Sequence, residues 1–439
     1  MTPRAQGTAQ DEVVTLASEL IRIDTTNTGD PETSKGERAA AEYVAAKLEE
    51  VGLETTVLES EPGRANVITR IEGVDRSRPG LLIHGHLDVV PAEPSEWTVH
   101  PFSGEVKDDY VWGRGAVDMK DMDAMTLALA REWMREGRKP PRDIVLAFVA
   151  DEEHGGRKGA RWLVDNHPGL FEGCSEAISE VGGFSVTVRD DLRLYLIQTA
   201  EKGLGWMKLA ARGRPGHGSM VHEDNAVTAL CEAVARLGRH EFPIVMTKTL
   251  RAFLDALAEA FGVELDPDDI EATIAKLGNL ARIIGATLRN TANPTMVNAG
   301  YKTNVIPSSA TATVDGRFLP GQEEEFERQL DEILGPDIER EWIVYDQALE
   351  TSFDGALVDA MAQALRDEDE HARPVPYMMS GGTDAKSFDR LGIRGFGFSP
   401  LLLPPDLDFA ALFHGIDERV PTEALRFGVR VLDRFVRAC

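Results

Sequence analysis

The chain has 439 residues, 42% of them apolar and 28% charged, which predicts a folded globular protein of two domains. Its formal net charge of −27 argues against nucleic acid and anionic membranes as partners, because both repel a strongly acidic protein. The cysteines (Cys174, Cys231 and Cys439) are too few for a disulfide framework, and no apolar run predicts a signal peptide or a membrane span, so a cytoplasmic location is expected.

The first 200 residues alternate predicted helices with predicted strands. Amphipathic periodicity predicts helices over 11–22, 37–51 and 120–136. Short apolar runs predict strands over 54–59, 66–71, 81–87 and 143–150. This alternation is typical of an α/β fold with a mostly parallel sheet sandwiched by helices.

The pattern changes after residue 200. Strands are predicted over 203–212, 295–302, 309–318 and 339–345, and helices over 225–237, most of 241–292, and 322–334. Residues 201–346 therefore form a predicted α+β domain inserted into the first one. The first domain, 1–200, is expected to resume over 347–439, with helices over 354–367 and 422–437 and a strand over 395–399.

The predicted strand over 81–87 ends in polar groups. It runs into His84-Gly85-His86-Leu87-Asp88, and imidazole and carboxylate groups inside a protein cost free energy unless something pairs with them. On an extended chain His86 and Asp88 point the same way, which suits a metal ligand with a partner that fixes its tautomer. A satisfied histidine at a strand end explains this stretch alone equally well.

Further acidic groups follow strands or glycine-rich turns. Asp118 follows Gly113 and Gly115, the strand over 143–150 runs into Asp151-Glu152-Glu153, and a short apolar run ends at Glu180. A plain helix N-cap at Asp118 and an ordinary acidic loop at 151–153 are the simpler interpretations. Because sites form at the carboxyl ends of strands in α/β sheets, one sheet could instead bring all these side chains together.

Carboxylates gathered in this way would raise one another's pKa values steeply unless cations compensate them. Two divalent cations supply that charge, and a set of histidines and carboxylates without cysteine suits Zn²⁺, and also Co²⁺ or Mn²⁺. A two-metal site also needs a bridging carboxylate and a free carboxylate that accepts a proton from water. Adjacent Glu152 and Glu153 can divide the roles of proton acceptor and ligand.

Four motifs together resemble those of a known family. They are His-Gly-His-Leu-Asp at 84–88, Gly-Arg-Gly-Ala-Val-Asp-Met-Lys at 113–120, Asp-Glu-Glu-His-Gly-Gly at 151–156 and His-Gly-Ile-Asp-Glu at 414–418. The chain, over roughly 11–437, resembles the di-zinc metallopeptidase family that includes aminoacylase, carboxypeptidase G, succinyl-diaminopimelate desuccinylase and the yeast Gly-X carboxypeptidase. Asp121 stands where that family often has glycine.

The resemblance implies a role for each motif residue of the metal centre. His86, Asp118 and Glu180 would hold one metal, and Asp118, Glu153 and His414 the other, with Asp118 as the bridge. Asp88 would orient the imidazole of His86. Glu152 would be the general base, and then the general acid toward the leaving amine.

The resemblance also assigns roles outside the metal ligands. The inserted block would be a lid and dimerisation domain, whose His217 reaches the partner subunit's site to stabilise an oxyanion. Asn304 and Arg317 resemble residues that hold a substrate carboxylate, although a structural ion pair is the alternative for Arg317. The stretch Gly381-Gly382-Thr383 matches a substrate-facing loop.

The expected function is metal-dependent hydrolysis of an amide or peptide bond next to a free carboxylate, as in a dipeptidase or a carboxypeptidase. Deacylation of an N-acyl amino acid is the alternative. A non-catalytic metal-binding protein of the same fold is a third interpretation, which Glu152 disfavours because a binding protein needs no proton acceptor. The expected partners are a small peptide or N-acyl amino acid substrate and a second copy of the chain.

Overall fold

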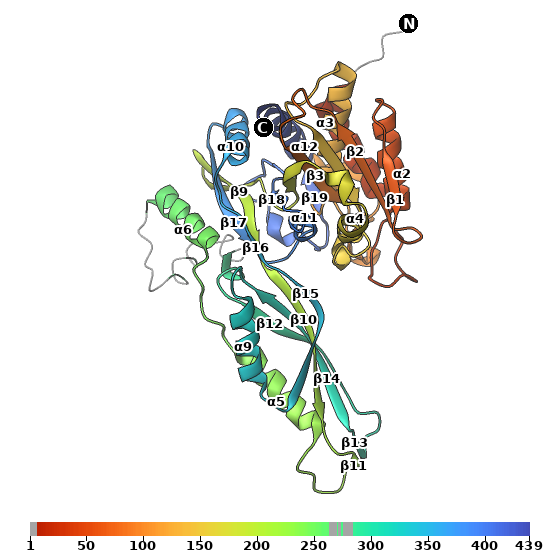
Figure 1. The fold of residues 1–439 in the computed structure, drawn as a ribbon, viewed down its shortest axis with the longest axis vertical. Coiled ribbons are helices and arrows are strands. Elements are labelled where there is room, and N and C mark those ends of the chain that lie inside the picture. Colours follow the sequence, from red (N-terminus) through yellow and green to blue (C-terminus); the bar gives the residue numbers. More distant parts are fainter. Residues whose placement is uncertain (1–6, 263–269, 271–273, 275–283) are drawn as a thin grey trace. The chain divides into compact units, whose positions relative to one another are not determined.

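The computed structural model describes residues 7–262, 270, 274 and 284–439. The chain divides into two compact units (Figure 1). Unit 1 comprises Met1–Thr199, Thr351–Tyr377 and Thr383–Cys439, and unit 2 comprises Ala200–Glu350 and Met378–Gly382. Unit 1 is therefore assembled from three stretches of chain.

A mixed sheet runs through unit 1, with the strand order β1-β2-β6-β3-β7-β18-β9, and β8 and β17 also pair with β9. Its strands are β1 (Thr56–Glu59), β2 (Ala65–Ile71), β3 (Gly80–His86), β6 (Ile144–Val149), β7 (Cys174–Ser179), β8 (Phe184–Arg189), β9 (Leu192–Glu201), β17 (Ala372–Met379) and β18 (Arg394–Gly397). A smaller sheet joins β4 (Glu105–Lys107), β5 (Tyr110–Trp112) and β19 (Arg419–Pro421).

The parallel pairing predicted from the sequence joins the four central strands, β6, β3, β7 and β18. The β1–β2, β2–β6, β8–β9 and β18–β9 pairs are antiparallel. Only residues 60–64 join β1 to β2, and only residues 190–191 join β8 to β9. Connections this short make hairpins, whereas a parallel pair needs a long crossover.

Helices cover both faces of this sheet, as predicted for an α/β sandwich. They are α1 (Ala9–Arg22), α2 (Arg38–Glu49), α3 (Lys120–Glu136), α4 (Ala160–Asn166), α10 (Ala356–Glu368), α11 (Ala385–Asp389) and α12 (Thr422–Ala438). Helix α3 packs against β3 and against α1, α2 and α12 (Figure 1). On the other face, Leu163 of α4 and Phe388 of α11 join a buried cluster with Leu82 and Val145 of the sheet. Short 3₁₀ turns lie at Pro94–Glu96, Glu152–His154, Pro168–Phe171 and Phe409–Ala411.

Unit 2 has its own antiparallel sheet, with the strand order β12-β14-β10-β15. Its elements are β10 (Gly203–Arg212), β11 (Gly216–His217), α5 (Ala226–Arg239), α6 (Lys248–Phe261), β12 (Thr291–Ala299), β13 (Val305–Ile306), β14 (Ser309–Phe318), α9 (Glu323–Leu334), β15 (Ile338–Asp346) and β16 (Leu349–Glu350). Every second residue of β10 is buried, and Met207 and Leu209 pack in one core with Leu230 of α5 and Phe326 of α9.

The predicted helical stretch over 241–292 is only partly described. Helix α6 ends at Phe261, and the following Gly262 takes the left-handed conformation (φ 64°) typical of a helix C-terminus. Most of 263–283 lies outside the described residues. Strand β12 begins at Thr291, earlier than the predicted 295.

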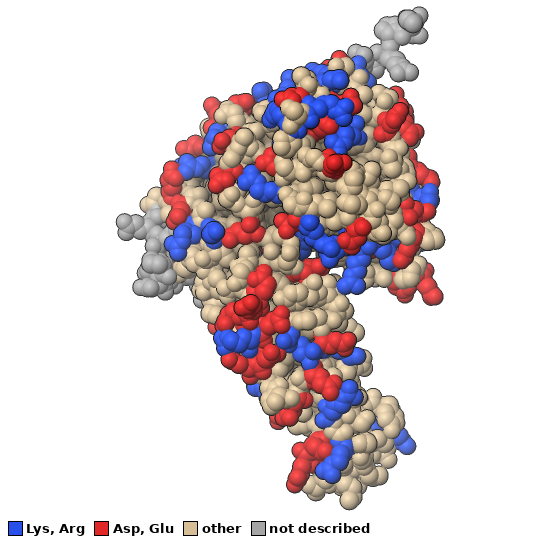
Figure 2. Space-filling view, viewed as in Figure 1, with Lys and Arg blue, Asp and Glu red and all other residues tan. Residues whose placement is uncertain are grey.

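The charge distribution agrees with the acidic composition. On the face shown in Figure 2, basic side chains are interspersed with acidic ones, and acidic side chains gather over α9, which begins with Glu323, Glu324 and Glu325. Within the described part of the chain, no helix is both long enough and apolar enough to span a membrane.

The packing of α12 yields a stability prediction. A Cβ atom on Gly428 would lie 2.1 Å from Sδ of Met125 and 2.5 Å from the carbonyl oxygen of Pro400. Gly428→Ala is expected to lower the free energy of unfolding by about 1–3 kcal/mol through overpacking, despite the better helix propensity of alanine. Denaturant unfolding measures this. Gly169→Ala, where a Cβ would meet no atom within 4 Å, is the control, and equal stability of the two variants would contradict the prediction.

Candidate metal centre

The first group of candidate metal ligands consists of His86, Asp118 and Glu180, all buried. His86 is the last residue of β3, and Glu180 directly follows β7, the parallel neighbour of β3. Nε2 of His86 lies 3.1 Å from Oδ1 of Asp118 and 3.5 Å from Oε2 of Glu180. The carboxyl ends of adjacent parallel strands thus bring His86 and Glu180 together, and the turn before α3 adds Asp118.

The second group consists of Asp118, Glu153 and His414. Nε2 of His414 lies 3.2 Å from Oδ2 of Asp118 and 3.2 Å from Oε2 of Glu153. Asp118 therefore presents one carboxylate oxygen to each group. The simpler interpretation of Asp118 as a helix N-cap does not hold, because the N-cap of α3 is Met119 and no side chain caps that helix.

This arrangement depends on a close approach between β3 and the beginning of α3. A Cβ atom on Gly85 would lie 2.3 Å from Oδ1 of Asp123 and 2.8 Å from Cε of Met119. Only glycine between His84 and His86 therefore allows the beginning of α3, and with it Asp118, to lie this close to the strand.

The buried carboxylates of the site need positive charge or protons to compensate their negative charge. Burial is the main cause that raises the pKa of Glu180 to about 7; His86 lowers it, and the neighbouring Asp118 and Glu153 contribute smaller increases. Burial, and then Glu180, raise the pKa of Glu152 well above its usual value. Hydrogen bonds with Asp118 and Glu153 raise the pKa of His414 to about 10. These raised pKa values mean that protons compensate the carboxylates when no cation is bound. Imidazole nitrogens and carboxylate oxygens together are a donor set that fits divalent metals such as Zn²⁺.

Glu152 and Asp88 lie beside these two groups. Oε2 of Glu152 is 3.9 Å from Nε2 of His86. Nδ1 of His86 contacts the backbone carbonyl oxygen of Asp88 at 2.9 Å, whereas the Asp88 carboxylate is 3.6 Å away. That carboxylate instead accepts the backbone N–H groups of Glu152 (3.1 Å) and Glu153 (3.2 Å). The shorter contact of Asp88 with the imidazole is thus through its main chain, because its side chain is engaged by the next turn.

Sequence reasoning missed a buried pair that fixes the loop before Asp118. Glu418 accepts the backbone N–H of Val117 (2.7 Å) and of Asp118 (3.3 Å), and its other oxygen pairs with Arg114 at 2.7 Å. Burial raises the pKa of Glu418 to about 7. The signal was present in the sequence, since Arg114 and Glu418 belong to the motifs that contain Asp118 and His414.

The other predicted site residues belong mostly to unit 2. His217 and Asn304 lie close together, because β11 pairs with β13 and the N–H of Gly218 donates to the carbonyl oxygen of Asn304 at 2.9 Å. Arg317 lies in β14, where Nε donates to Oδ1 of Asp315 at 2.7 Å. Gly381 and Gly382 belong to unit 2, whereas Thr383 belongs to unit 1 and accepts the N–H of Ala385 there at 3.2 Å.

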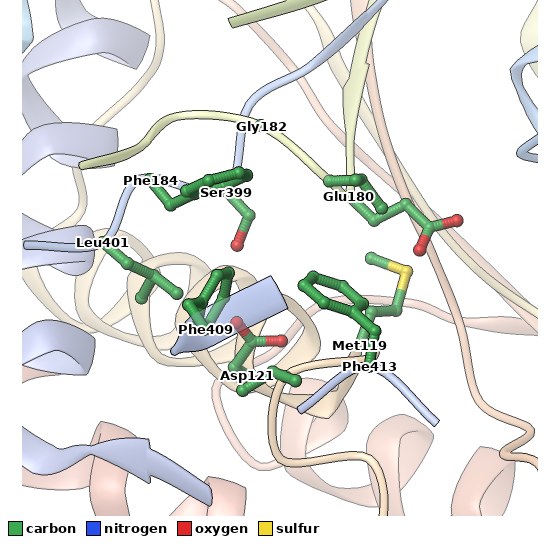
Figure 3. Close-up of a pocket in the computed structure, with 11 residues that line it drawn as sticks. Met119, Asp121, Glu180, Gly182, Phe184, Ser399, Leu401, Phe409 and Phe413 are labelled. Atoms are coloured by element: carbon green, nitrogen blue, oxygen red, sulfur yellow. The ribbon is translucent and has the colours of Figure 1, made fainter. Parts of the chain in front are cut away.

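A small pocket in unit 1 is bounded by Glu180 (Figure 3). Its walls are largely apolar, with the side chains of Phe184, Leu401, Phe409 and Phe413. The hydroxyl of Ser399 and the carboxyl group of Asp121 point into it from facing sides. Burial raises the pKa of Asp121 to about 8, so this acid is mostly neutral at pH 7. The pocket is thus a largely apolar recess with two carboxyl groups, Asp121 and the candidate metal ligand Glu180, in its wall.

Comparisons with known proteins find a matching family, similar sequences and a similar structure. A family model described as "Peptidase family M20/M25/M40" matches residues 82–438. The N-fatty-acyl-amino acid synthase/hydrolase PM20D1 of Xenopus tropicalis is 28% identical, over 95% of this chain and 84% of the relative. Aminoacylase-1 of Sus scrofa is 26% identical, over 97% of this chain and 94% of the relative. The crystal structure of the M20 family metallo-carboxypeptidase Sso-CP2 from Sulfolobus solfataricus superimposes with a TM-score of 0.73 at 18% identity, over 98% of this chain and 99% of that one.

Metal loading is expected to release protons. At pH 7, His414 with a pKa of about 10 is protonated and Glu180 with a pKa of about 7 is half protonated, and each must lose its proton to bind a cation. Affinity should therefore weaken as the pH falls. Calorimetric titration of metal-free protein with Zn²⁺, in buffers of different ionisation enthalpy, counts the released protons. The His414→Ala variant should release fewer protons. A binding enthalpy that is the same in all buffers would contradict the prediction.

Proposed function

The chain belongs to peptidase family M20/M25/M40 and is a metal-dependent hydrolase of peptide or amide bonds, and from this premise we propose its substrate and mechanism. The substrate is a small peptide or N-acyl amino acid whose scissile bond lies next to a free carboxylate. The observation that carries the proposal is that Asp118 belongs to two ligand groups while the carboxylate of Glu152 lies beside them.

In this proposal two Zn²⁺ ions are held by the residues expected from the sequence. His86, Asp118 and Glu180 hold one, and Asp118, Glu153 and His414 hold the other. When bound, such ions make a water molecule more acidic and polarise an amide carbonyl group. Arg114 and Glu418 keep the Asp118 backbone in place, so that the bridging carboxylate keeps its direction.

Glu152 moves the proton. Its carboxylate accepts a proton from the attacking water and delivers it to the nitrogen of the leaving amine. Its burial suits this role, because a carboxyl group with a raised pKa holds a proton long enough to pass it on. Without this transfer the amine would leave as an unstable anion.

His217 is proposed to donate a hydrogen bond to the oxyanion in the partner subunit's site. Nδ1 of His217 accepts the backbone N–H of Ser219 at 3.2 Å, so the proton of the neutral imidazole lies on Nε2. The side chain is exposed, which leaves that N–H available as a donor. Asn304 and Arg317, with the loop Gly381-Gly382-Thr383, are proposed to contact the substrate, with the guanidinium binding its carboxylate.

A homodimer through unit 2 is part of the same proposal. Strand β12 is an edge of the unit 2 sheet, and Met296 and Val297 on it are 61% and 57% exposed. Tyr301, just beyond the strand, is 83% exposed. An unpaired edge strand with exposed apolar side chains is a natural place for a second chain to pair. The free cysteines, including exposed Cys231, support the proposed cytoplasmic location.

Deacylation of an apolar N-acyl amino acid is the second candidate. The side chains of Phe184, Leu401, Phe409 and Phe413 lie on the apolar side of the small recess beside Glu180, so a substrate group that borders this recess would meet apolar surface. Two relatives matched over most of their length are named N-fatty-acyl-amino acid synthase/hydrolase PM20D1 and Aminoacylase-1. Steady-state rates on dipeptides and on N-acyl amino acids with acetyl, succinyl and longer acyl groups decide between the candidates, and no chelator-sensitive hydrolysis of either class would refute the proposal.

Glu152→Gln tests the base directly. It keeps the shape of the side chain but removes the proton acceptor, so kcat should fall by about 10²–10⁴-fold while the bound metal is unchanged. Steady-state kinetics with metal analysis of the same samples measure both quantities. Glu172→Gln, a change on the exposed surface of the same unit, is the control. An unchanged kcat in Glu152→Gln would show that another group takes the proton.

Mixing two inactive variants tests the partner-subunit role of His217. His217→Ala should lower kcat by about 10²–10³-fold, as loss of one oxyanion donor does. A dimer of His217→Ala with Glu152→Gln then has one site with an intact Glu152 and an intact His217 from the partner subunit. Refolding the two variants together should restore activity. If the refolded mixture stays inactive although sedimentation shows dimers, His217 acts within its own subunit or has no role in catalysis.

A further inference from the structure

The turn that carries Glu152 and Glu153 begins with an unusual backbone conformation. Asp151 has φ 69°, in the left-handed region that a residue other than glycine rarely adopts. Its carbonyl oxygen accepts the N–H of His154 (3.2 Å) and of Gly156 (2.6 Å), which closes the turn. Such a conformation persists only where its surroundings hold it. The groups that hold this turn therefore decide where the two glutamates point.

Two buried carboxylates hold the turn, and they belong to Asp88 and Asp151. The Asp88 carboxylate accepts the backbone N–H groups of Glu152 and Glu153, one on each oxygen. Oδ1 of Asp151 accepts a hydrogen bond from Nη2 of Arg64 at 2.5 Å, and Oδ2 accepts one from the backbone N–H of Lys158 at 2.9 Å. Both carboxylates are buried, and besides the Arg64 guanidinium on Asp151, a hydrogen-bond donor between the two lowers their mutual repulsion.

The group between them is the side-chain amide of Asn27. Nδ2 of Asn27 donates to Oδ2 of Asp88 at 2.8 Å and to Oδ1 of Asp151 at 3.2 Å. A neutral amide nitrogen with two hydrogens can serve both carboxylates at once. An aspartate in the same place would add a third negative charge and would have no hydrogen to donate.

Asn27 is itself held firmly. Its backbone N–H donates to the carbonyl oxygen of Val89 at 2.9 Å, next to a parallel bridge between Thr26 and Val89. Oδ1 of Asn27 accepts the N–H of Gly29 at 3.0 Å. Gly29 lies against the turn, since a Cβ atom there would be 2.5 Å from Cε1 of His154. The segment after α1 is thus fixed to the strand end that carries Asp88 and to the turn that carries Glu152.

We propose that Asn27 is a positioning residue for Glu152: its amide ties the Asp88 and Asp151 carboxylates together and so directs the Glu152 side chain toward the reacting bond. Asn27 touches neither the substrate nor a metal ligand side chain in this role, and it acts through the backbone of the turn. The inference rests on the proposed function, in which Glu152 is the base.

Asn27→Asp is the sharpest test, because it keeps the size of the side chain while it removes the donor and adds a negative charge. The expected result is a fall in kcat of about 10–100-fold, as for other groups that support an active-site residue, with KM nearly unchanged. Bound metal, measured on the same samples under saturating Zn²⁺, should equal that of the wild type. Asn27→Ala adds no charge, so it should show a smaller fall in kcat, again with KM nearly unchanged. It remains informative if Asn27→Asp does not fold.

Thr25→Val is the matched control. Thr25 is fully buried in the same segment, and its Oγ1 donates to the carbonyl oxygen of Leu87 at 2.6 Å, but it touches neither carboxylate. It should lower the thermal midpoint and leave kcat intact. A wild-type kcat in folded Asn27→Asp and Asn27→Ala, or a loss of kcat that merely follows a loss of metal, would overturn the inference. An inactive wild type would instead refute the proposed function.

Discussion

The repulsion among carboxylates around Asp118 is the constraint on which the rest of the structure depends. Asp118, Glu153 and Glu180 are gathered with Glu152 in a space where burial raises the pKa values of all three glutamates. A protein tolerates such a cluster only when cations, or protons in their place, compensate it. The imidazoles of His86 and His414 complete two ligand groups that share Asp118. The shared aspartate explains why its backbone is so closely held.

The supporting contacts act mainly on the backbone. Glu418 holds the N–H groups at Val117 and Asp118, and Asp88 holds those of Glu152 and Glu153. In the proposed function, holding the main chain leaves the carboxylates of Asp118, Glu152 and Glu153 free to face the metals and the substrate. The arrangement also shows why buried acids need not be ligands: Asp88 and Glu418 are both fully buried, and their oxygens are occupied by hydrogen bonds from this chain.

The division into two units separates two kinds of chemistry. The candidate metal ligands and Glu152 all belong to unit 1, built on a sheet whose central strands are parallel. His217, Asn304 and Arg317 belong to unit 2, which has its own sheet and its own core. In the proposed function, unit 1 supplies hydrolysis, and unit 2 supplies contacts to the oxyanion and to the substrate carboxylate. The small pocket beside Glu180 adds an apolar surface within unit 1.

The sequence by itself determined the α/β class, the ranges of most helices and strands, and the motif residues that the structure brings into two ligand groups. It could do so because periodicity is local, and because polar groups at the ends of buried strands stand out against their surroundings. Only the tertiary structure decided the antiparallel margins of the sheet, the main-chain contact of Asp88 with His86, and the contacts of Asn27, Arg64 and Glu418. Those contacts join residues far apart in the chain, such as Val117 with Glu418. Hydrogen-bond partners and pKa shifts depend on burial and direction in space, which no local pattern of residues encodes.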